Sequence, residues 1–231
     1  VELNVSAAAS LTDVLKDIND LYTKKHPNVT ITPNFAASGT LQTQIQQGAP
    51  CDVFISAGAK QMDALQSGGL ILDDTRKDLL NNKIVLIVPN NSTLGLTKFE
   101  DLTNSNVKII AIGDPKSVPA GTYGKTALEK LGIYSQVESK FNKASDVRQV
   151  LTWAENGEAD AGIVYSTDAK ISDKVKVVDE DPTDVSKTIV YPVAVIKASE
   201  NPDAAQKYVD FLSSDQAKAV FEDYGFVMAE D

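Results

Sequence analysis

Short apolar segments alternate with amphipathic helical segments along most of the chain, and this alternation most constrains the fold. In residues 1–70, strand-like runs are each followed by a stretch whose apolar residues recur every three or four positions. The predicted strands and helices are, in order, 3–8, 11–25, 29–34, 40–47, 52–56 and 60–66. This β-α-β-α-β-α series predicts a doubly wound α/β lobe built on a parallel sheet.

Two long β-branched runs, 83–89 and 189–196, bracket a second series of strands and helices. This second series contains strands at 108–112 and 162–165 and helices at 121–131 and 146–156, and two more helices follow at 203–212 and 215–224. The pattern favours two doubly wound α/β lobes joined by two crossover strands. Residues 1–82 plus 196–231 would form lobe 1, and 83–195 would form lobe 2, including the hinge strands. One continuous sheet with long excursions is the alternative.

Composition and charge limit the classes of partner. The chain has 231 residues, of which 42% are hydrophobic, so it is long enough to bury a substantial core. The formal net charge is −10, which disfavours binding to nucleic acid and to anionic membrane surfaces. An anionic ligand would also gain no long-range attraction, so local dipoles would have to hold it.

The N-terminus and the single cysteine bear on location. Val1 already begins a strand-like run with no leader before it, so we expect a mature or truncated chain whose export signal has been removed. Cys51 is the only cysteine and cannot form an internal disulfide. So few thiols fit an oxidising compartment.

Two early junctions repeat one pattern, in which small residues end a strand, a serine follows, and a helix begins. Ser10 and Ser38 occupy these positions, with no lysine or arginine in either segment. Each serine is consistent with a simple N-cap, and Ser10 with Asp13 would make a weak capping box. The pairing favours an anion site, because helix N-termini present N–H groups at the positive end of the helix dipole.

Three later junctions offer similar donors. The loop 113–123 leads into a helix and presents the N–H of Ala120, and a further helix start presents the N–H of Val147. Tyr165 ends a buried strand, where its hydroxyl needs a ligand oxygen or a backbone carbonyl as partner. We expect Arg148 to pair with a nearby carboxylate and Lys116 to be solvated.

Several enzyme and metal chemistries lack their residues. His26 is the only histidine, so the chain has no zinc constellation and no histidine-based triad. No phosphate-binding loop of the Gly-x-x-x-x-Gly-Lys type and no Gly-x-Ser-x-Gly elbow occurs. Asp13 and Asp52 are explained by a helix cap and a strand start, which disfavours hydrolysis by paired carboxylates. The chain is therefore not expected to be an enzyme.

Eight motifs, in order, give the chain a family resemblance over essentially its full length. They are Ala-Ala-Ala-Ser-Leu-Thr (7–12), Phe-Ala-Ala-Ser-Gly-Thr-Leu (35–41), Gly-Ala-Pro-Cys-Asp-Val-Phe-Ile-Ser-Ala (48–57), Gly-Asp-Pro-x-x-Val-Pro-Ala-Gly-x-Tyr (113–123), Asp-Val-Arg (146–148), Gly-Ile-Val-Tyr (162–165), Tyr-Pro-Val-Ala-Val (191–195) and Tyr-Gly-Phe (224–226). The chain resembles the bacterial periplasmic molybdate-binding proteins, the solute receptors of ABC importers. Any one motif alone would be weak, whereas the ordered set is specific.

The resemblance implies a type II periplasmic binding protein fold that holds a tetrahedral oxyanion, molybdate or tungstate, between two lobes. It implies that serine hydroxyls, backbone N–H groups and a tyrosine bind the anion, and these positions correspond to Ser10, Ser38, Ala120, Val147 and Tyr165. It also implies no cofactor, a monomer, and delivery to the permease and ATPase subunits of an importer. The location would be periplasmic or extracellular, with a lipid anchor left open. Cys51 stands where the family pattern has alanine.

A site made only of hydrogen-bond donors would discriminate between anions by whether the anion itself carries a proton. Hydrogen phosphate would present an O–H group with no acceptor, and an unpaired buried group of that kind costs about 1–3 kcal/mol. Sulfate would have to be rejected by size. A receptor for sulfate or another tetrahedral oxyanion is the alternative within this fold, and an enzyme or a regulatory domain is the alternative from another class.

Overall fold

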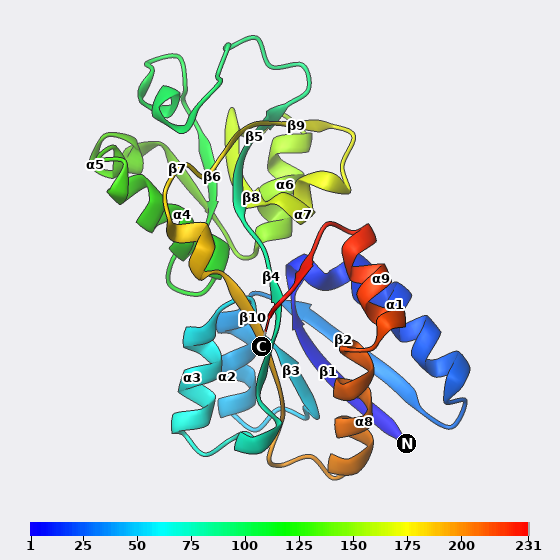
Figure 1. Ribbon diagram of the computed structural model, residues 1–231. Coiled ribbons are helices and arrows are strands. Elements are labelled where there is room, and N and C mark those ends of the chain that lie inside the picture. The colour runs from blue at the N-terminus through cyan, green and yellow to red at the C-terminus, as the bar shows by residue number, and fades with distance from the viewer. Residues whose placement is uncertain (231) are drawn as a thin grey trace. The chain divides into compact units, whose positions relative to one another are not determined.

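The backbone leaves its first sheet after Asn81 and returns to it at Val190, which divides the chain into two units. The computed structural model describes residues 1–230. Unit 1 consists of Val1–Asn81 together with the segment that starts at Val190, and unit 2 consists of Asn82–Ile189 (Figure 1). Each unit has its own sheet and its own buried core.

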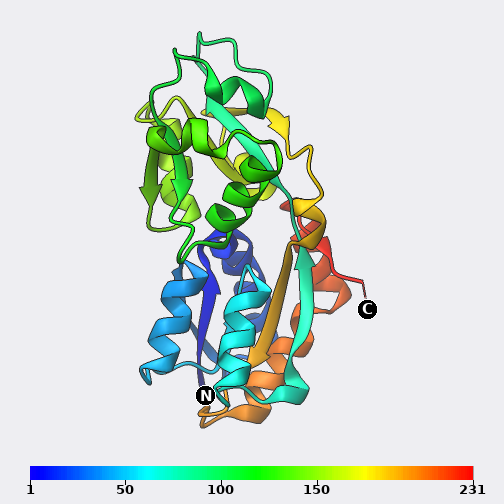
Figure 2. The same cartoon turned by 90° about the vertical axis from the view of Figure 1, so that its left-hand side faces the viewer.

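Unit 1 is built on a six-stranded mixed sheet in the order β11-β4-β10-β3-β1-β2. The strands are β1 (Glu2–Ala8), β2 (Thr30–Ala36), β3 (Val53–Ile55), β4 (Lys77–Asn81), β10 (Val190–Val195) and β11 (Val227–Met228). The helices are α1 (Thr12–Lys25), α2 (Ser38–Gln46), α3 (Ala59–Ser67), α8 (Pro202–Leu212) and α9 (Asp215–Asp223). Helices α2 and α3 lie side by side on one face (Figure 2), and α1, α8 and α9 cover the other.

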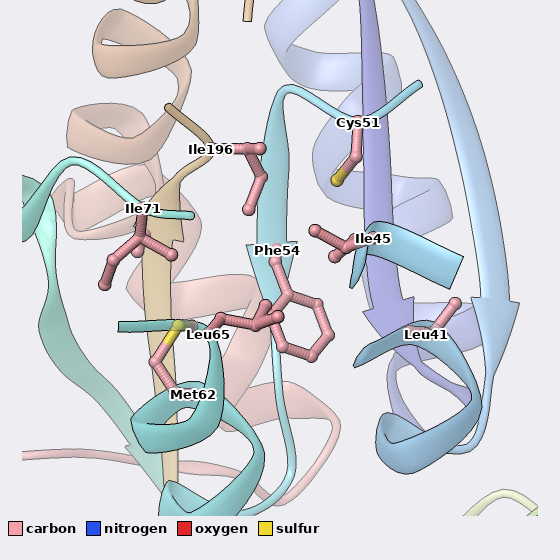
Figure 3. Close-up of a cluster of buried hydrophobic side chains, with 9 residues drawn as sticks. Leu41, Ile45, Cys51, Phe54, Met62, Leu65, Ile71 and Ile196 are labelled. Atoms are coloured by element: carbon pink, nitrogen blue, oxygen red, sulfur yellow. The ribbon is translucent and has the colours of Figure 1, made fainter. Parts of the chain in front are cut away.

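A cluster of buried side chains fills the space between the sheet of unit 1 and helices α2 and α3. Phe54 from β3 lies among side chains of both helices and of the segments that flank the sheet (Figure 3). The cluster comprises Leu41, Ile45, Cys51, Phe54, Met62, Leu65, Ile71, Ala194 and Ile196. Because these residues come from widely separated parts of the chain, the C-terminal segment is part of the same core as the N-terminal one.

Unit 2 has a five-stranded mixed sheet in the order β7-β6-β8-β5-β9. Its strands are β5 (Ile84–Pro89), β6 (Ile110–Gly113), β7 (Phe141–Ala144), β8 (Ala161–Tyr165) and β9 (Val175–Glu180). Its helices are α4 (Pro119–Lys130), α5 (Tyr134–Val137), α6 (Val147–Glu155) and α7 (Ser166–Lys170). Helices α4 and α5 lie on one face of the sheet and α6 on the other (Figure 1).

Short 3-10 turns complete both units. They are Ala9–Leu11, Asp73–Thr75, Phe99–Thr103, Glu138–Lys140 and Val185–Thr188. Within residues 1–230, none of the helices combines the length and the apolar character needed to cross a membrane.

The structure corrects the expected lobe boundaries at two places. Residues 190–195 were expected in lobe 2, but β10 pairs antiparallel with β3 and β4, which places it in unit 1. Asn82, expected in lobe 1, belongs to unit 2. The run 189–196 is uniformly apolar, so its pattern does not say which sheet it joins, and the hydrogen-bonded register decides. The expected end of lobe 1, residue 231, lies outside the described residues.

The sequence also missed strands β4, β7, β9 and β11. Strands β4, β7 and β11 are short or carry polar and charged residues, so they lack the β-branched runs that mark buried strands. Strand β9 has three valines, but a lysine and two acidic residues interrupt its apolar pattern. Helices α2 and α4 begin two residues earlier than expected, at Ser38 and Pro119. The earlier starts move Ser38 and Ala120 from the loop into the first turn of a helix.

A close backbone approach fixes the start of α4 against the end of β6. A Cβ atom on Gly121 would lie 1.8 Å from the carbonyl oxygen of Gly113, and one on Gly113 would lie 2.4 Å from Cγ1 of Val118. Only glycine allows the first turn of α4 to approach the strand this closely.

Gly121→Ala is expected to lower the free energy of unfolding by about 2–4 kcal/mol, because a rigid carbonyl cannot move away from the added methyl group. Urea denaturation followed by circular dichroism measures the change. Gly68→Ala is the matched control, because its Cβ would meet the nearest atom at 3.4 Å. A Gly121→Ala protein as stable as the control would contradict the close approach.

Cys51 provides a second prediction, based on pH. Its Sγ donates to the Val53 carbonyl at 3.2 Å, and burial raises the pKa of the thiol from its ordinary value of 9.0 to about 11. The unfolded chain therefore ionises first, and the contribution of the thiol to stability is present below pH 9 and is lost as the pH rises toward 11. Relative to Cys51→Ala, the wild-type protein should lose about 2 kcal/mol over this range. Parallel pH profiles of the two proteins would contradict the raised pKa.

Candidate functional site

Three parallel strands of unit 1 end at the same edge of its sheet. Strand β1 pairs with β2 on one side and with β3 on the other, and Ala8 lies opposite Ala36 in the register. Ser10 and Ser38 each follow that register pair by two residues. The structure therefore brings the two predicted serines to the carboxyl ends of neighbouring strands, where open α/β sheets bind ligands.

Ser10 is held by a hydrogen bond with another hydroxyl group. It lies in the 3-10 turn Ala9–Leu11, is 2% exposed, and its Oγ is 2.8 Å from Oη of Tyr191 on β10. The N-cap position of α1 is Leu11, so the interpretation of Ser10 as the cap of this helix is wrong. The extra turn between strand and helix moves the serine away from the cap position.

Ser38 is the first residue of α2 and is fully buried. Its Oγ accepts a hydrogen bond from the Ala57 N–H at 2.9 Å, and the cap position is Ala37, so Ser38 also is not an N-cap. Because the oxygen accepts a bond from Ala57, the hydroxyl proton is available to a further acceptor, and accepting one bond strengthens the other.

Sequence reasoning missed Ala57 as part of this site. Ala57 follows β3 by two residues, and Ile55 of β3 lies opposite Ala7 of β1. In the structure Ser10 and Ser38 stand at the same offset past their strands, but in the sequence they were recognised by the small residues, the serine and the following helix. Ala57 was not recognised in this way. It was overlooked because alanine has no polar side chain, and the relevant donor is the backbone N–H group.

Three parallel strands of unit 2 end together in the same way. Strand β6 pairs with β7 and β8, with Gly113 opposite Ala144 and Ala111 opposite Gly162. Helices α4, α6 and α7 begin after these three strands. Ala120, Val147 and Tyr165 consequently lie at one edge of the unit 2 sheet, and all three are at most 3% exposed.

Two of these residues contribute backbone donors in a first helical turn. Ala120 is the second residue of α4 and Val147 is the first of α6. Helix geometry gives neither N–H group an acceptor within its own helix. The side chain of Asp146 caps α6 by accepting from the Gln149 N–H at 2.9 Å, so the cap uses a different donor from that of Val147.

Tyr165 ends β8 beside a buried ion pair. Its N–H donates to Oδ2 of Asp168 at 3.0 Å, and Oδ1 of the same carboxylate accepts from Nε of Arg148 at 2.8 Å. This confirms the expected pairing of Arg148 with a carboxylate. Burial raises the pKa of the Asp168 carboxyl, and the guanidinium of Arg148 opposes that rise by stabilising the anion.

The two basic residues of these junctions are either paired or exposed. Arg148 is paired with Asp168, and Lys116 is exposed in the loop before α4, as expected. Asp52 is engaged elsewhere, since it accepts bonds from the Asn4 N–H and the Ser199 hydroxyl. Among the described residues, no group of three or more histidine, cysteine, aspartate and glutamate side chains is placed to hold a metal ion.

Each unit thus presents neutral hydrogen-bond donors at the edge of its mixed sheet where three parallel strands end. This chemistry suits a small anion, and together with the fold it is typical of extracytoplasmic solute receptors. The model of the bacterial extracellular solute-binding protein family matches residues 3–227, and the chain belongs to this family.

Individual relatives match over nearly the whole chain. A putative ABC transporter substrate-binding lipoprotein of Bacillus subtilis, YvgL, is 44% identical over 98% of this chain and 86% of its own length. The molybdate-binding protein ModA of Haemophilus influenzae is 40% identical over 97% of this chain and 89% of its own. Among solved structures, the substrate-binding domain of a putative molybdenum ABC transporter from Clostridium difficile is 46% identical, with a TM-score of 0.74 and 99% of both chains covered.

Ser38→Ala is expected to lower the free energy of unfolding of the ligand-free protein by about 1–3 kcal/mol, because the buried Ala57 N–H loses its acceptor. Ser67→Ala, at the exposed end of α3, is the control and should change stability by less than about 0.5 kcal/mol. Urea denaturation of both variants checks the difference. Equal stabilities would show that the bond between Ser38 and Ala57 contributes nothing to the fold.

Proposed function

We propose that this protein is the molybdate receptor of an ABC importer and that it also accepts tungstate. The observation that carries the proposal is the set of neutral donors of Ser10, Ser38, Ala120, Val147 and Tyr165 at the ends of parallel strands. The names of the relatives support molybdate as the ligand. The expectation that the protein is a binding protein and not an enzyme is part of the same proposal.

Neutral donors can hold a dianion when several act together. Hydrogen bonds to a charged group contribute about 1.5–3 kcal/mol each. A helix N-terminus adds about 0.3–1 kcal/mol when exposed and up to about 2 kcal/mol when partly buried. Five such donors offset much of the cost of removing the anion from water, and a cation is not needed.

The donor set also favours fully ionised ligands. Molybdate and tungstate carry no proton at neutral pH, so every oxygen accepts. Hydrogen phosphate carries an O–H group, and a donor facing other donors has no acceptor. Sulfate has the right charge, so the receptor must exclude it by the distances between donors. A sulfate receptor is therefore the alternative that binding measurements must separate.

The partners and the location follow from the proposed class. The receptor would deliver its anion to membrane permease and ATPase subunits, and it would act as a monomer in the periplasm or at the outer face of the cell membrane. One relative is named as a lipoprotein, which supports a lipid-anchored form. The net charge of −10 supports the expectation that nucleic acid is not a partner.

Isothermal titration calorimetry with molybdate, tungstate, sulfate and phosphate tests the proposal. We expect one molybdate or tungstate per chain, with sulfate at least about 100-fold weaker and phosphate weaker still. Tighter binding of sulfate than of molybdate would overturn the molybdate assignment in favour of the alternative.

Substitutions in each unit test whether both donor sets hold the same anion. Ser10→Ala in unit 1 and Tyr165→Phe in unit 2 should each weaken molybdate binding by about 10-fold to 100-fold, because each removes one charge-assisted hydrogen bond. Tyr134→Phe, on the short helix α5, is the control and should bind as the wild type does. If only one of the two site variants loses affinity, a shared anion is contradicted.

A further inference from the structure

We propose that Arg148 and Asp168 are positioning residues. Their ion pair sets the distance between the Val147 N–H and the Tyr165 hydroxyl, and this distance selects the size of the bound oxyanion. This inference rests on the proposed function. It concerns residues that donate nothing to the anion in that proposal.

The contacts of Asp168 join the two helix starts that carry donors. Its carboxylate is fully buried and lies in the first turn of α7, and its Oδ2 accepts from the N–H of Tyr165 at 3.0 Å. Its Oδ1 accepts from Nε of Arg148, the residue directly after Val147, at 2.8 Å. One side chain therefore links the first turn of α6 to the end of β8.

Local contacts fix the start of α6 but do not connect it to β8. Asp146 caps the helix through the Gln149 N–H, and the Gln149 Oε1 accepts from the Ser145 N–H at 2.8 Å. Both contacts join residues of the single segment 145–149. The pair of Arg148 and Asp168 spans the two neighbouring helix starts, so a change in this pair is expected to alter their separation.

Energetics also favour a positioning role over a stabilising one. The Arg148 side chain is 21% exposed and the Asp168 side chain is 0% exposed, so at least one charge is fully removed from water. Buried ion pairs often add no net stability relative to apolar residues of similar volume, and their best-attested use is to specify one arrangement. The planar guanidinium suits this use because its donors have fixed directions.

The pair has a second effect, since it keeps the positive charge of Arg148 from acting as a general attractant. A free cation near the donors would attract sulfate and molybdate alike, because Coulomb attraction depends little on the size of the ion at this scale. With Asp168 as its counter-charge, Arg148 contributes geometry, and the distances between donors decide which anion fits.

The test is the selectivity ratio, the dissociation constant for sulfate divided by that for molybdate, measured by calorimetry. The double variant Arg148→Met with Asp168→Asn removes both charges, and its ratio should fall about tenfold or more below that of the wild type. If the double variant does not fold, Arg148→Lys serves instead, because it keeps the charge pair but loses the planar donor geometry. The ratio of this variant should also fall, by a smaller factor.

Two control variants separate positioning from stability. Leu151→Ala removes a buried side chain from the same helix and should lower the melting temperature while leaving the ratio unchanged. Lys83→Met with Glu180→Gln removes an exposed ion pair of unit 2 and should change neither quantity.

An unchanged selectivity ratio in the Arg148 variants, with molybdate bound by the wild type, would overturn this inference alone. A wild-type protein that binds no molybdate would overturn the proposed function, and the inference with it. If Leu151→Ala lowers the selectivity ratio as much as the Arg148 variants do, lost stability is the cause. That outcome also contradicts a positioning role.

Discussion

The parallel register of neighbouring strands is the constraint on which the candidate site depends. In each unit, three strands run in the same direction and end at one edge of a sheet, and a helical turn begins just beyond each of them. A shift of one residue in any of these pairings would move the side chains of that strand to the other face of the sheet and displace the turn that follows by one residue. The placement of a donor such as the Val147 N–H is thus decided by hydrogen bonds within the sheet before any ligand is involved.

Much of the architecture was predictable because the central strands are apolar and the helices between them are amphipathic. The serine junctions were also predictable, since in each of them small residues end a strand, a serine follows, and a helix begins. The local roles of these serines were not predictable. Whether a serine caps a helix depends on where the first turn begins, and a shift of two residues moved Ser38 from the expected loop into α2.

The remaining features depend on contacts between distant parts of the chain or on backbone groups, which the sequence pattern does not reveal. Strand β10 has the same apolar composition whichever sheet it joins, and only its pairing with β3 and β4 assigns it to unit 1. The sequence indicated that Arg148 needs a carboxylate but did not identify Asp168, which lies 20 residues away on another helix. Ala57 was missed because a backbone donor has no signature in residue type.

The hydrogen bond between Ser10 and Tyr191 bears on how the proposed site could accept an anion. Both partners are hydroxyl groups 2.8 Å apart, and either one can act as the donor. In the proposed site, the Ser10 hydroxyl would turn to the anion while the Tyr191 hydroxyl donates to the Ser10 oxygen. Through this exchange of donor roles, Ser10 could present its proton to the proposed ligand and still keep Tyr191 as a partner.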